Sequence, residues 1–509
     1  MNQLQEIFTA WGIAFNPNDE QAEKAAKRIE VCNSCDKKVT NLGVHRCSVC
    51  GCALKGKVYS PIDGACPEGK WDEIDAEYTK SQQVEITKED TIFVQIASYR
   101  DPELNNTLKD LFINADYPDN LRVCIAHQYG EDDWDNLDSF KDDKRVKILS
   151  IPHEESKGTC WARNKIQQEY NNEKYTLQLD SHHRFINGWD KELINMLVKL
   201  QKKGYKKPLL SSYIPSYFPE KDPQGRTQEV WQLDFNRFTP QGYIYTFPAT
   251  IPDWKNLKEP IIARFYSAHF AFTLGQFCKE VSHDPNMYFH GEEPSISARA
   301  FTWGYDIFHP HKIIAWHFYS RNGFKKHWDD HQNWGEIDSK SFLRYRQLHE
   351  MDDIVRTEEL NKSFKDYDFG TVRTLKDYEH FAGVRFKDRK VTQHTKDKKP
   401  PSFNLIGKEE EYEKDLVEYF RHCIDIHESH FKENDYDFWV VAFEMNDGSV
   451  IDRSDANEEE LNKLLRAARD GDGWVRIWRE FDGKYPDKYV VWPHSKSKDY
   501  IERLEVSLK

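Results

Sequence analysis

The sequence predicts an α/β protein built around a mostly parallel β-sheet, with a cysteine-rich module before it and a smaller α+β domain after it. Between residues 91 and 214, strand-type apolar runs such as TIFVQIAS alternate with helical stretches such as WDKELINMLVKLQKK. This alternation is typical of parallel sheets with helices on both faces. Six of the ten cysteines lie between Cys32 and Cys66. In the last hundred residues, several strand-type runs accompany two helical stretches.

The composition excludes several classes of protein. The 509 residues are 38% hydrophobic and 14% aromatic, which is enough apolar material for more than one core and argues against disorder. The formal net charge of −14 disfavours a general nucleic-acid binder, and no apolar run is long enough to span a membrane. The first residues, MNQLQEIFTAWGIAF, lack the basic start and apolar stretch of a signal peptide. We therefore expect a cytoplasmic protein.

The predicted elements follow one another in a regular order. After a helix over residues 1–30, strands are predicted at 91–98, 122–127, 145–151, 174–180 and 208–214. The helices between them are predicted at 102–115, 160–172 and 189–203. Later in the chain we expect a helix over 409–431, several strands, and a helix over 457–469. In sheets of this type ligands bind beyond the carboxyl ends of the strands, so the residues that follow each strand are where chemistry is expected.

Shifts in composition divide the chain into domains. Charged and proline-containing stretches that are poor in aliphatic residues indicate linkers. The predicted organisation is a helix with a zinc-ribbon-like module over 1–72, a linker over 73–90, the main α/β domain over 91–387, a linker over 388–403, and an accessory α+β domain over 404–509.

The cysteine cluster predicts a structural metal site. Two C-x2-C pairs lie a short loop apart, a spacing that lets four thiolates surround one tetrahedral Zn²⁺. The predicted ligands are Cys32, Cys35, Cys47 and Cys50. Four cysteine ligands leave no open position for catalysis. Disulfides are the alternative, which the missing signal peptide weakens. Cys52 and Cys66 are surplus, and each could replace one of the four ligands or be a buried thiol.

The segment LQLDSHHRF carries the second metal-ligand pattern. A predicted strand runs directly into Asp180 and, two residues later, His182. In an extended chain these two side chains point to the same side, so a carboxylate and an imidazole can chelate one divalent ion. The same alternation favours His182 over the adjacent His183 as the ligand. Taken alone, a D-x-H pattern is weak, because three-residue patterns recur by chance.

Longer stretches of sequence make the pattern specific. The stretches are IASYRDPEL (96–104), GTCWARNKIQQEY (158–170), YTLQLDSHHRFINGWD (175–190) and HGEEPSISARAFTWGYDIFHPHKIIAWHFYSR (290–321). In order and spacing they resemble glycosyltransferase family 60, which includes cytosolic UDP-GlcNAc-dependent transferases that modify hydroxyproline in polypeptides. YDFGTVRTLKDYEHFAGVRF (367–386) resembles the family's C-terminal portion. The resemblance implies a GT-A fold, a UDP-sugar donor, and transfer with retention to a polypeptide hydroxyl. It does not cover the cysteine module or the residues after about 404.

The resemblance also implies residue roles around a divalent ion. Asp180 and His182 occupy the D-x-H position, and His317 matches the third metal ligand. This donor set suits Mn²⁺ or Mg²⁺, with diphosphate oxygens completing the coordination. Asp180 is thereby also a catalytic residue. Without the family, His317 would be interpreted as a core histidine.

Further roles concern the donor substrate. The uridine is expected on the loop formed by Ala97, Ser98, Tyr99, Arg100 and Asp101. Arg163 is expected to pair with the diphosphate, and Ser181 to touch the ribose or the metal shell. Gly291 would allow close approach to the sugar, while Glu292 and Glu293 would bind its hydroxyls or act as general base. The alternative for both glutamates is a place in the first turn of a helix, where its dipole favours them.

Two other functions stay open from the sequence. The acceptor could be a modified DNA base or a glycan, presented by the zinc module, although the acidic chain does not favour nucleic acid. The fold could instead serve as a non-catalytic module that binds sugar or protein. The intact D-x-H pattern, the G-E-E stretch and the late histidine argue against loss of catalysis.

Overall fold

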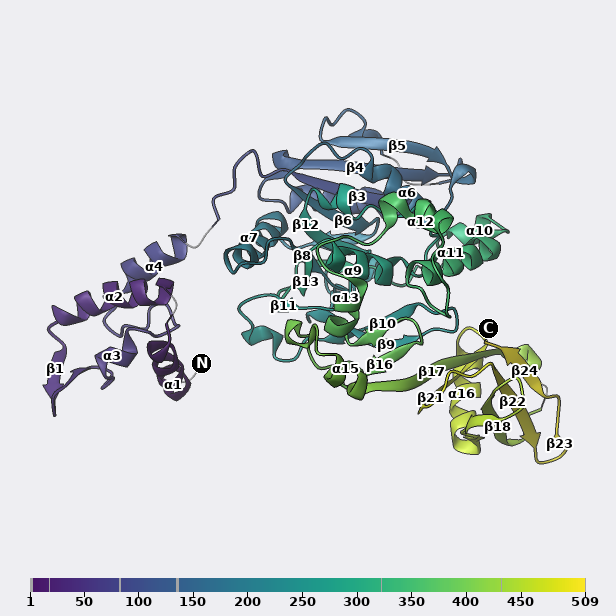
Figure 1. The fold of residues 1–509 in the computed structure, drawn as a ribbon. Helices are drawn as coiled ribbons and strands as arrows, with labels where there is room; N and C mark the ends of the chain where they lie inside the picture. Colours follow the sequence, from purple (N-terminus) through teal and green to yellow (C-terminus); the bar gives the residue numbers. More distant parts are fainter. Residues whose placement is uncertain are drawn as a thin grey trace. The chain divides into compact units, whose positions relative to one another are not determined.

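The structure is a computed structural model that describes residues 3–17, 19–81, 84–133, 137–321, 323–431 and 433–508. Its ribbon is shown in Figure 1. The chain divides into two compact units, residues 1–85 and 86–509.

The first unit consists of helices and one short hairpin. Its elements are α1 (Gln3–Phe15), α2 (Asp19–Asn33), β1 (Lys38–Asn41), β2 (Val44–Cys47), α3 (Leu54–Lys57) and α4 (Asp72–Ser81). The helix predicted over 1–30 is therefore two helices, with Pro17 between them, because proline has no N–H to continue a helix. The core centres on Trp71, which is 1% exposed and lies under the guanidinium of Arg28.

An eight-stranded sheet forms the centre of the second unit. In spatial order its strands are β11 (Ile261–Ile262), β13 (Asp306–His309), β8 (Pro208–Ser211), β12 (Phe270–Leu274), β6 (Tyr175–Asp180), β3 (Ile92–Tyr99), β4 (Leu121–Tyr129) and β5 (Val146–Pro152). Strands β3 to β6 are mutually parallel, and β13 is parallel to β8. β12 runs antiparallel between β6 and β8, and β11 runs antiparallel to β13. The mostly parallel α/β sheet is confirmed, with two reversed strands that the sequence did not reveal.

Helices and two strand pairs surround this sheet. The helices are α5 (Leu104–Ile113), α6 (Thr159–Gln167), α7 (Trp189–Lys202), α8 (Phe277–Glu280), α9 (Glu292–Thr302), α10 (His327–Asp330), α11 (Trp334–Leu348), α12 (Glu358–Phe364) and α13 (Leu375–Ala382). The strand pairs are β9 (Trp231–Phe238) with β10 (Ile244–Thr250), and β7 (His183–Phe185) with β14 (Ala315–His317). Among the described helices, none is both long and apolar enough to cross a membrane.

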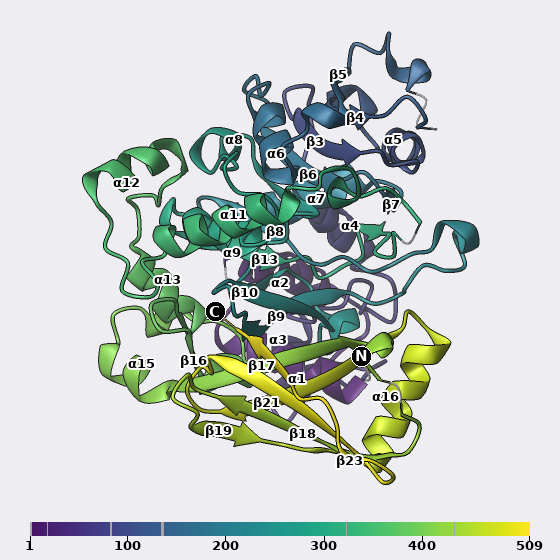
Figure 2. The same ribbon diagram turned by 90° about the vertical axis from the view of Figure 1, so that its right-hand side faces the viewer.

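The C-terminal part is an α+β arrangement of two antiparallel sheets. One contains β15 (Val384–Arg385), β16 (Lys390–Thr392), β17 (Leu416–His427) and β21 (Trp474–Asp482). The other contains β18 (Tyr436–Glu444), β19 (Val450–Arg453), β20 (Ala456–Asn457), β22 (Lys488–Ser495), β23 (Asp499–Tyr500) and β24 (Leu504–Ser507). Helix α16 (Glu458–Asp470) packs against β18 and β21 (Figure 2).

The helix predicted over 409–431 is wrong for most of its length. Only α15 (Glu409–Asp415) is helical, and the chain then continues as the twelve-residue strand β17. Phe420, Ile424 and Ile426 lie an even number of residues apart and are all buried in the C-terminal core. That even spacing fits the period of a strand, and β-branched and aromatic residues favour strands as well.

Both predicted linkers contain secondary structure. Helix α4 occupies much of 73–90, and the stretch 388–403 forms β16 and α14 (Gln393–Lys396). Val391 and Thr395 of the second stretch are buried. Part of the polar composition that indicated linkers therefore comes from short helices and strands, which bury one side and expose polar residues on the other. The domain boundaries at these points remain predictions.

Candidate active site

The carboxyl ends of two parallel strands bring the main site together. β3 and β6 are in register so that Ala97 lies opposite Asp180. β6 ends at Asp180, and the chain turns through Ser181 and His182 into β7. β7 pairs with β14, which places His317 opposite His183. β3 and β6 are buried along most of their length, so the core of the unit fixes the position of their carboxyl ends.

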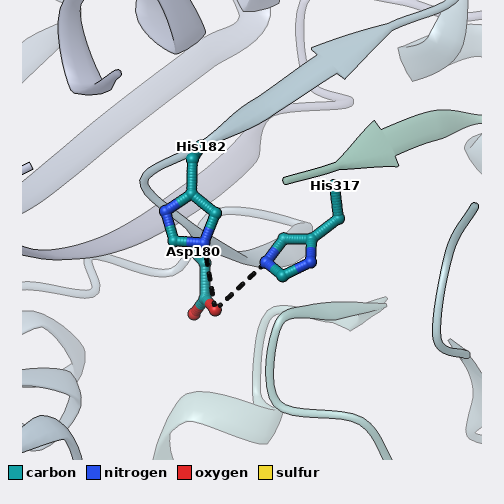
Figure 3. A group of neighbouring side chains, drawn as sticks. All are labelled: Asp180, His182 and His317. Carbon is teal, nitrogen blue, oxygen red and sulfur yellow. Dashed lines mark ion pairs between the residues drawn. The ribbon is translucent and has the colours of Figure 1, made fainter. Parts of the chain in front are cut away.

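Asp180, His182 and His317 converge on one point (Figure 3). Oδ2 of Asp180 lies 3.5 Å from Nε2 of His317 and 3.9 Å from Nε2 of His182. Within the described part of the chain, this is the only group of three or more carboxylate, imidazole or thiol side chains whose ligand atoms lie within 4.8 Å of one another. Both ring nitrogens of His317 are buried without a hydrogen-bond partner. His183 instead directs Nδ1 at the carbonyl oxygen of Asp180, 3.0 Å away.

Asp101 orients His182, the second residue of the triad formed by Asp180, His182 and His317. Its Oδ2 lies 2.6 Å from Nδ1 of His182 and accepts a 2.6 Å hydrogen bond from Oγ of Ser181. Burial alone would raise the pKa of Asp101, but the nearby His182 and its hydrogen bond hold that pKa below the ordinary range. A carboxylate on one imidazole nitrogen fixes the ring so that the other nitrogen faces the metal position. Asp101 is therefore placed to orient His182 and is not exposed to a nucleoside.

Arg163 joins two carboxylates. Its Nη2 donates to Oδ1 of Asp180 over 2.6 Å, and its Nη1 donates to Glu292 over 2.6 and 2.7 Å. Nε2 of His283 also lies 2.7 Å from Glu292. Burial would raise the pKa of Glu292, but Arg163 and His283 keep that pKa lowered. Arg163 is thus held by protein carboxylates on two sides.

Glu293 has a different environment from its neighbour. Its Oε1 accepts from the backbone N–H of Ala268 over 2.9 Å, and its Oε2 accepts from the hydroxyl of Tyr213 over 3.0 Å. Burial, with the nearby charge of Glu292, raises the pKa of Glu293 to about 7. Gly291 is the N-cap residue before α9 and has a φ of +85°, a conformation that favours glycine.

The triad forms part of the wall of a cavity of about 490 Å³. Seven of the predicted site residues line it: Ala97, Tyr99, Arg163, Asp180, Ser181, His182 and His317. The other six predicted site residues of this unit are not in its lining: Ser98, Arg100, Asp101, Gly291, Glu292 and Glu293. Among the nearby aromatic residues, Tyr319 lines the cavity, whereas Trp303 and Trp316 pack in apolar clusters.

Arg100, expected on the uridine loop, is instead surrounded by carboxylates. Its Nε donates to Asp133 over 2.9 Å and its Nη1 to Asp330 over 3.1 Å, and its Nη2 pairs with Asp132. The backbone φ of Arg100 is +46°, an uncommon conformation for a residue with a side chain. Asp330 also accepts from the hydroxyl of Tyr99 over 2.7 Å, so Arg100 ties the end of β3 to α10.

Two basic residues of the cavity wall were missed from the sequence. Arg321 and Lys326 both line the cavity, and Nη2 of Arg321 lies 3.6 Å from Oδ2 of Asp101. Arg321 closes the motif WHFYSR, so its position four residues after His317 could have indicated it. His269, whose ring stacks on His317 at 4.4 Å, follows no motif and gave no signal.

Comparison with known proteins supports one family. The model of the family described as Glycosyltransferase (GlcNAc) matches residues 91–144 and 137–388, more than half of the chain. Comparison with curated proteins finds no match. The match spans all three triad residues and all the residues that line the cavity.

Solved structures give more distant likenesses. GalNAc-T7 with UDP, GalNAc and Mn²⁺ is 12% identical over 82% of this chain and 72% of that chain, with a TM-score of 0.44. S. aureus TarS 1–349 with UDP-GlcNAc is 13% identical over 54% and 80%, with a TM-score of 0.30. The mannosyltransferase PcManGT from Pyrobaculum calidifontis, with GDP-Man and Mn²⁺, is 12% identical over 50% and 69%, with a TM-score of 0.26. The assignment depends on the family match, which agrees with the motifs in the sequence: the chain belongs to the Glycosyltransferase (GlcNAc) family and is a glycosyltransferase.

Proposed function

We propose that the protein transfers GlcNAc from UDP-GlcNAc to a hydroxyl group of a polypeptide, with retention, and that it uses Mn²⁺ or Mg²⁺. One observation carries the proposal: a carboxylate and two imidazoles converge in the wall of a 490 Å³ cavity that also contains Arg321 and Lys326. A divalent ion and two cations in one cavity suit a nucleoside diphosphate, whose negative charge they can balance. The name of the family supports GlcNAc as the sugar.

The triad fits a divalent ion by its donors. One oxygen and two imidazole nitrogens are ligands that Mn²⁺ accepts, and three protein donors leave coordination positions for substrate oxygens. The contact between Nε2 of His317 and Oδ2 of Asp180, at 3.5 Å, is long for a hydrogen bond, and a metal ion held by both residues would satisfy the buried nitrogen. When bound, a divalent ion would stabilise the negative charge that develops on the leaving diphosphate.

The protein's own residues prepare the site for that ion. Asp101 holds the ring of His182, and Arg163 holds Asp180 through its other carboxylate oxygen. Both contacts are buried, so they fix the ligand positions before substrate arrives. Arg321 and Lys326 then remain the basic side chains placed for the diphosphate, because Arg163 is already paired with Asp180 and Glu292.

The positions of the carboxylates favour a mechanism that retains the configuration at the anomeric carbon of the sugar. Among the described residues that line the cavity, Asp180 is the only carboxylate, and it belongs to the metal group. Glu292 is paired with Arg163, and Glu293 binds Ala268 and Tyr213, so neither lies where a general base would reach the acceptor. In a retaining transfer the departing phosphate can itself take the acceptor proton, and no protein base is needed. Transfer then depends on positioning and electrostatic stabilisation.

The polypeptide acceptor follows from the resemblance of the motifs to family 60. Serine, threonine and hydroxyproline all offer the required hydroxyl. A glycan or a modified DNA base is the competing class, and an acceptor screen separates the classes.

Donor and acceptor can be tested in sequence. The full-length protein is incubated with several UDP-sugars and Mn²⁺, and release of UDP is measured with and without candidate acceptors. We expect UDP-GlcNAc to be used best, release to stop with EDTA and return with Mn²⁺, and Asp180→Ala to be inactive. Mass spectrometry of polypeptides and oligonucleotides incubated in parallel shows which class gains the sugar. Release that depends neither on Mn²⁺ nor on Asp180 would refute the proposed site, and glycosylated oligonucleotides would refute the acceptor.

A further inference from the structure

The fold sorts the six clustered cysteines of the first unit into two groups. Five of them line one cavity of about 30 Å³: Cys32, Cys35, Cys47, Cys50 and Cys66. Cys52 is not in this lining, and its thiol donates to the carbonyl oxygen of Cys50. All six are free thiols. A cavity of this size accommodates a single ion but no organic ligand.

Two donors lie at a sulfur of the first C-x2-C pair, and a tight turn follows the second pair. The backbone N–H of Lys37 donates to Sγ of Cys35 over 3.4 Å, and the Nζ of Lys70 lies 3.3 Å from the same sulfur. After the second pair, Gly51 has a φ of +71°, and its N–H donates to the carbonyl oxygen of Cys47 over 2.9 Å. Donors and cations beside sulfur favour the thiolate, which is the form that binds metal.

Trp71 supplies a further donor at the cavity. It is 1% exposed, lines the cavity with the cysteines, and its side chain hydrogen-bonds the sulfur of Cys32, which favours the thiolate of that residue. A buried N–H is costly unless it has an acceptor. Negatively charged sulfur ligands would offer it an acceptor, since a site with four thiolates around Zn²⁺ carries a net negative charge.

The neighbours of each cysteine indicate which four belong together. Cys32, Cys47 and Cys66 pack in the same apolar cluster. Cys35 belongs to the same C-x2-C pair as Cys32, and its sulfur receives the two donors described above. Cys50 is not a member of the apolar cluster, and its carbonyl oxygen instead accepts from the thiol of Cys52.

We propose that the first unit binds one Zn²⁺ through the thiolates of Cys32, Cys35, Cys47 and Cys66. Cys66 thus takes the place that spacing in the sequence assigned to Cys50. Among the described residues, no three of these sulfurs lie within 4.8 Å of one another. Zn–S bonds of about 2.3 Å hold the sulfurs of a tetrahedral site roughly 3.8 Å apart. Because the four ligands lie in separate segments of this unit, metal binding is coupled to its folding.

Differential alkylation tests the ligand set on the unmodified full-length protein. Zinc is first counted by elemental mass spectrometry, and the native protein is then treated with iodoacetamide and mapped by peptide mass spectrometry. We expect one zinc per chain and at least tenfold slower alkylation of the four ligands than of Cys52 and Cys50. After removal of zinc with a chelator, all six should react. Absence of zinc would overturn the site, and a reactive Cys66 beside a protected Cys50 would overturn the ligand set.

Two serine variants provide an independent check. Cys66→Ser should lose zinc to a competing chelator at least tenfold more readily than the wild type, whereas Cys52→Ser, the matched control, should match the wild type. Equal retention by both variants would contradict the proposal. If Cys66→Ser is insoluble, the alkylation pattern of the wild type decides alone. Zinc content is measured without any sugar donor, so failure here is distinguishable from failure of the proposed transferase activity.

Discussion

The two units each gather metal-ligand side chains, but with opposite chemistry and surroundings. In the first unit, thiols line a cavity of about 30 Å³, and the Nζ of Lys70 lies 3.3 Å from the sulfur of Cys35. In the second unit, one carboxylate and two imidazoles lie in the wall of a cavity of about 490 Å³. Four soft ligands close the shell of a metal, whereas three oxygen and nitrogen ligands leave room for substrate. Donor type and adjoining space, taken together, distinguish a structural ion from a catalytic one.

The largest expected effect comes from removing one metal ligand of the Asp180, His182 and His317 group, called the open site below, while the cysteine site stays intact. Asp180→Asn keeps the size of the side chain and removes its charge, which weakens metal binding and frees one side of Arg163. Because a divalent ion contributes several kcal/mol to stabilising developing charge, we expect the transfer rate to fall by roughly 10³-fold. Zinc content should stay at one per chain. Asp119→Asn, at a carboxylate that is 97% exposed, is the matched control. Loss of zinc in the Asp180 variant would show that the two sites are not independent.

A smaller effect is expected one contact away from the metal position. Asp101→Asn keeps a hydrogen-bond acceptor for Nδ1 of His182 but removes the negative charge. Changes in residues that orient metal ligands typically reduce metal affinity by about 10- to 100-fold. We expect the Mn²⁺ concentration for half-maximal activity to rise about tenfold, with activity largely restored at saturating Mn²⁺. A titration of activity with Mn²⁺ measures this. An unchanged Mn²⁺ requirement with reduced maximal rate would instead assign Asp101 to substrate.

The third effect in order of size is on KM for the UDP-sugar, after replacement of the basic residues that line the cavity. Arg321→Gln and Lys326→Gln should each raise KM for the UDP-sugar about tenfold, since a charged hydrogen bond to phosphate contributes roughly 1.5–3 kcal/mol. Lys325→Gln is the matched control, because Lys325 is an exposed neighbour of Lys326 that does not line the cavity. Steady-state kinetics at saturating Mn²⁺ separates KM from kcat. An equal change in the Lys325 variant would mean that general surface charge attracts the donor.

The sequence predicted the features of the two candidate sites that follow local rules. Strand periodicity placed Asp180 and His182 at the end of β6, and spacing identified the cysteine pairs. His317 needed the family resemblance, because the pairing of β14 with β7 that brings it to Asp180 joins segments about 130 residues apart. The contacts of Arg163 and Asp101 could not be predicted, since they depend on which buried charges the fold brings together. The direction of β12 could not be predicted for the same reason. It lies antiparallel between β6 and β8, and its apolar sequence does not indicate that direction.

The smallest expected effect concerns Glu293, a buried carboxylate of the second unit that does not line the cavity. Burial raises the pKa of Glu293 to about 7, above a value of about 4.3 for the unfolded chain. Between these two values the folded protein binds a proton that the unfolded chain releases, so this residue makes stability fall as pH rises from about 4.3 to about 7. Glu293→Gln imitates the protonated form and removes that slope.

We therefore expect Tm of the Glu293→Gln variant to exceed that of the wild type increasingly between about pH 5 and pH 7, and by a constant amount above that range. Each pKa unit corresponds to about 1.4 kcal/mol, which in a unit of this size shifts Tm by about 1–2 °C. Glu292→Gln is the opposing comparison. Its carboxylate is paired with Arg163 and His283 and its pKa is lowered, so its replacement should lower Tm at neutral pH. Parallel pH profiles for the wild type and the Glu293 variant would contradict a protonated Glu293, and the carboxylates beside the open site would then be equally charged.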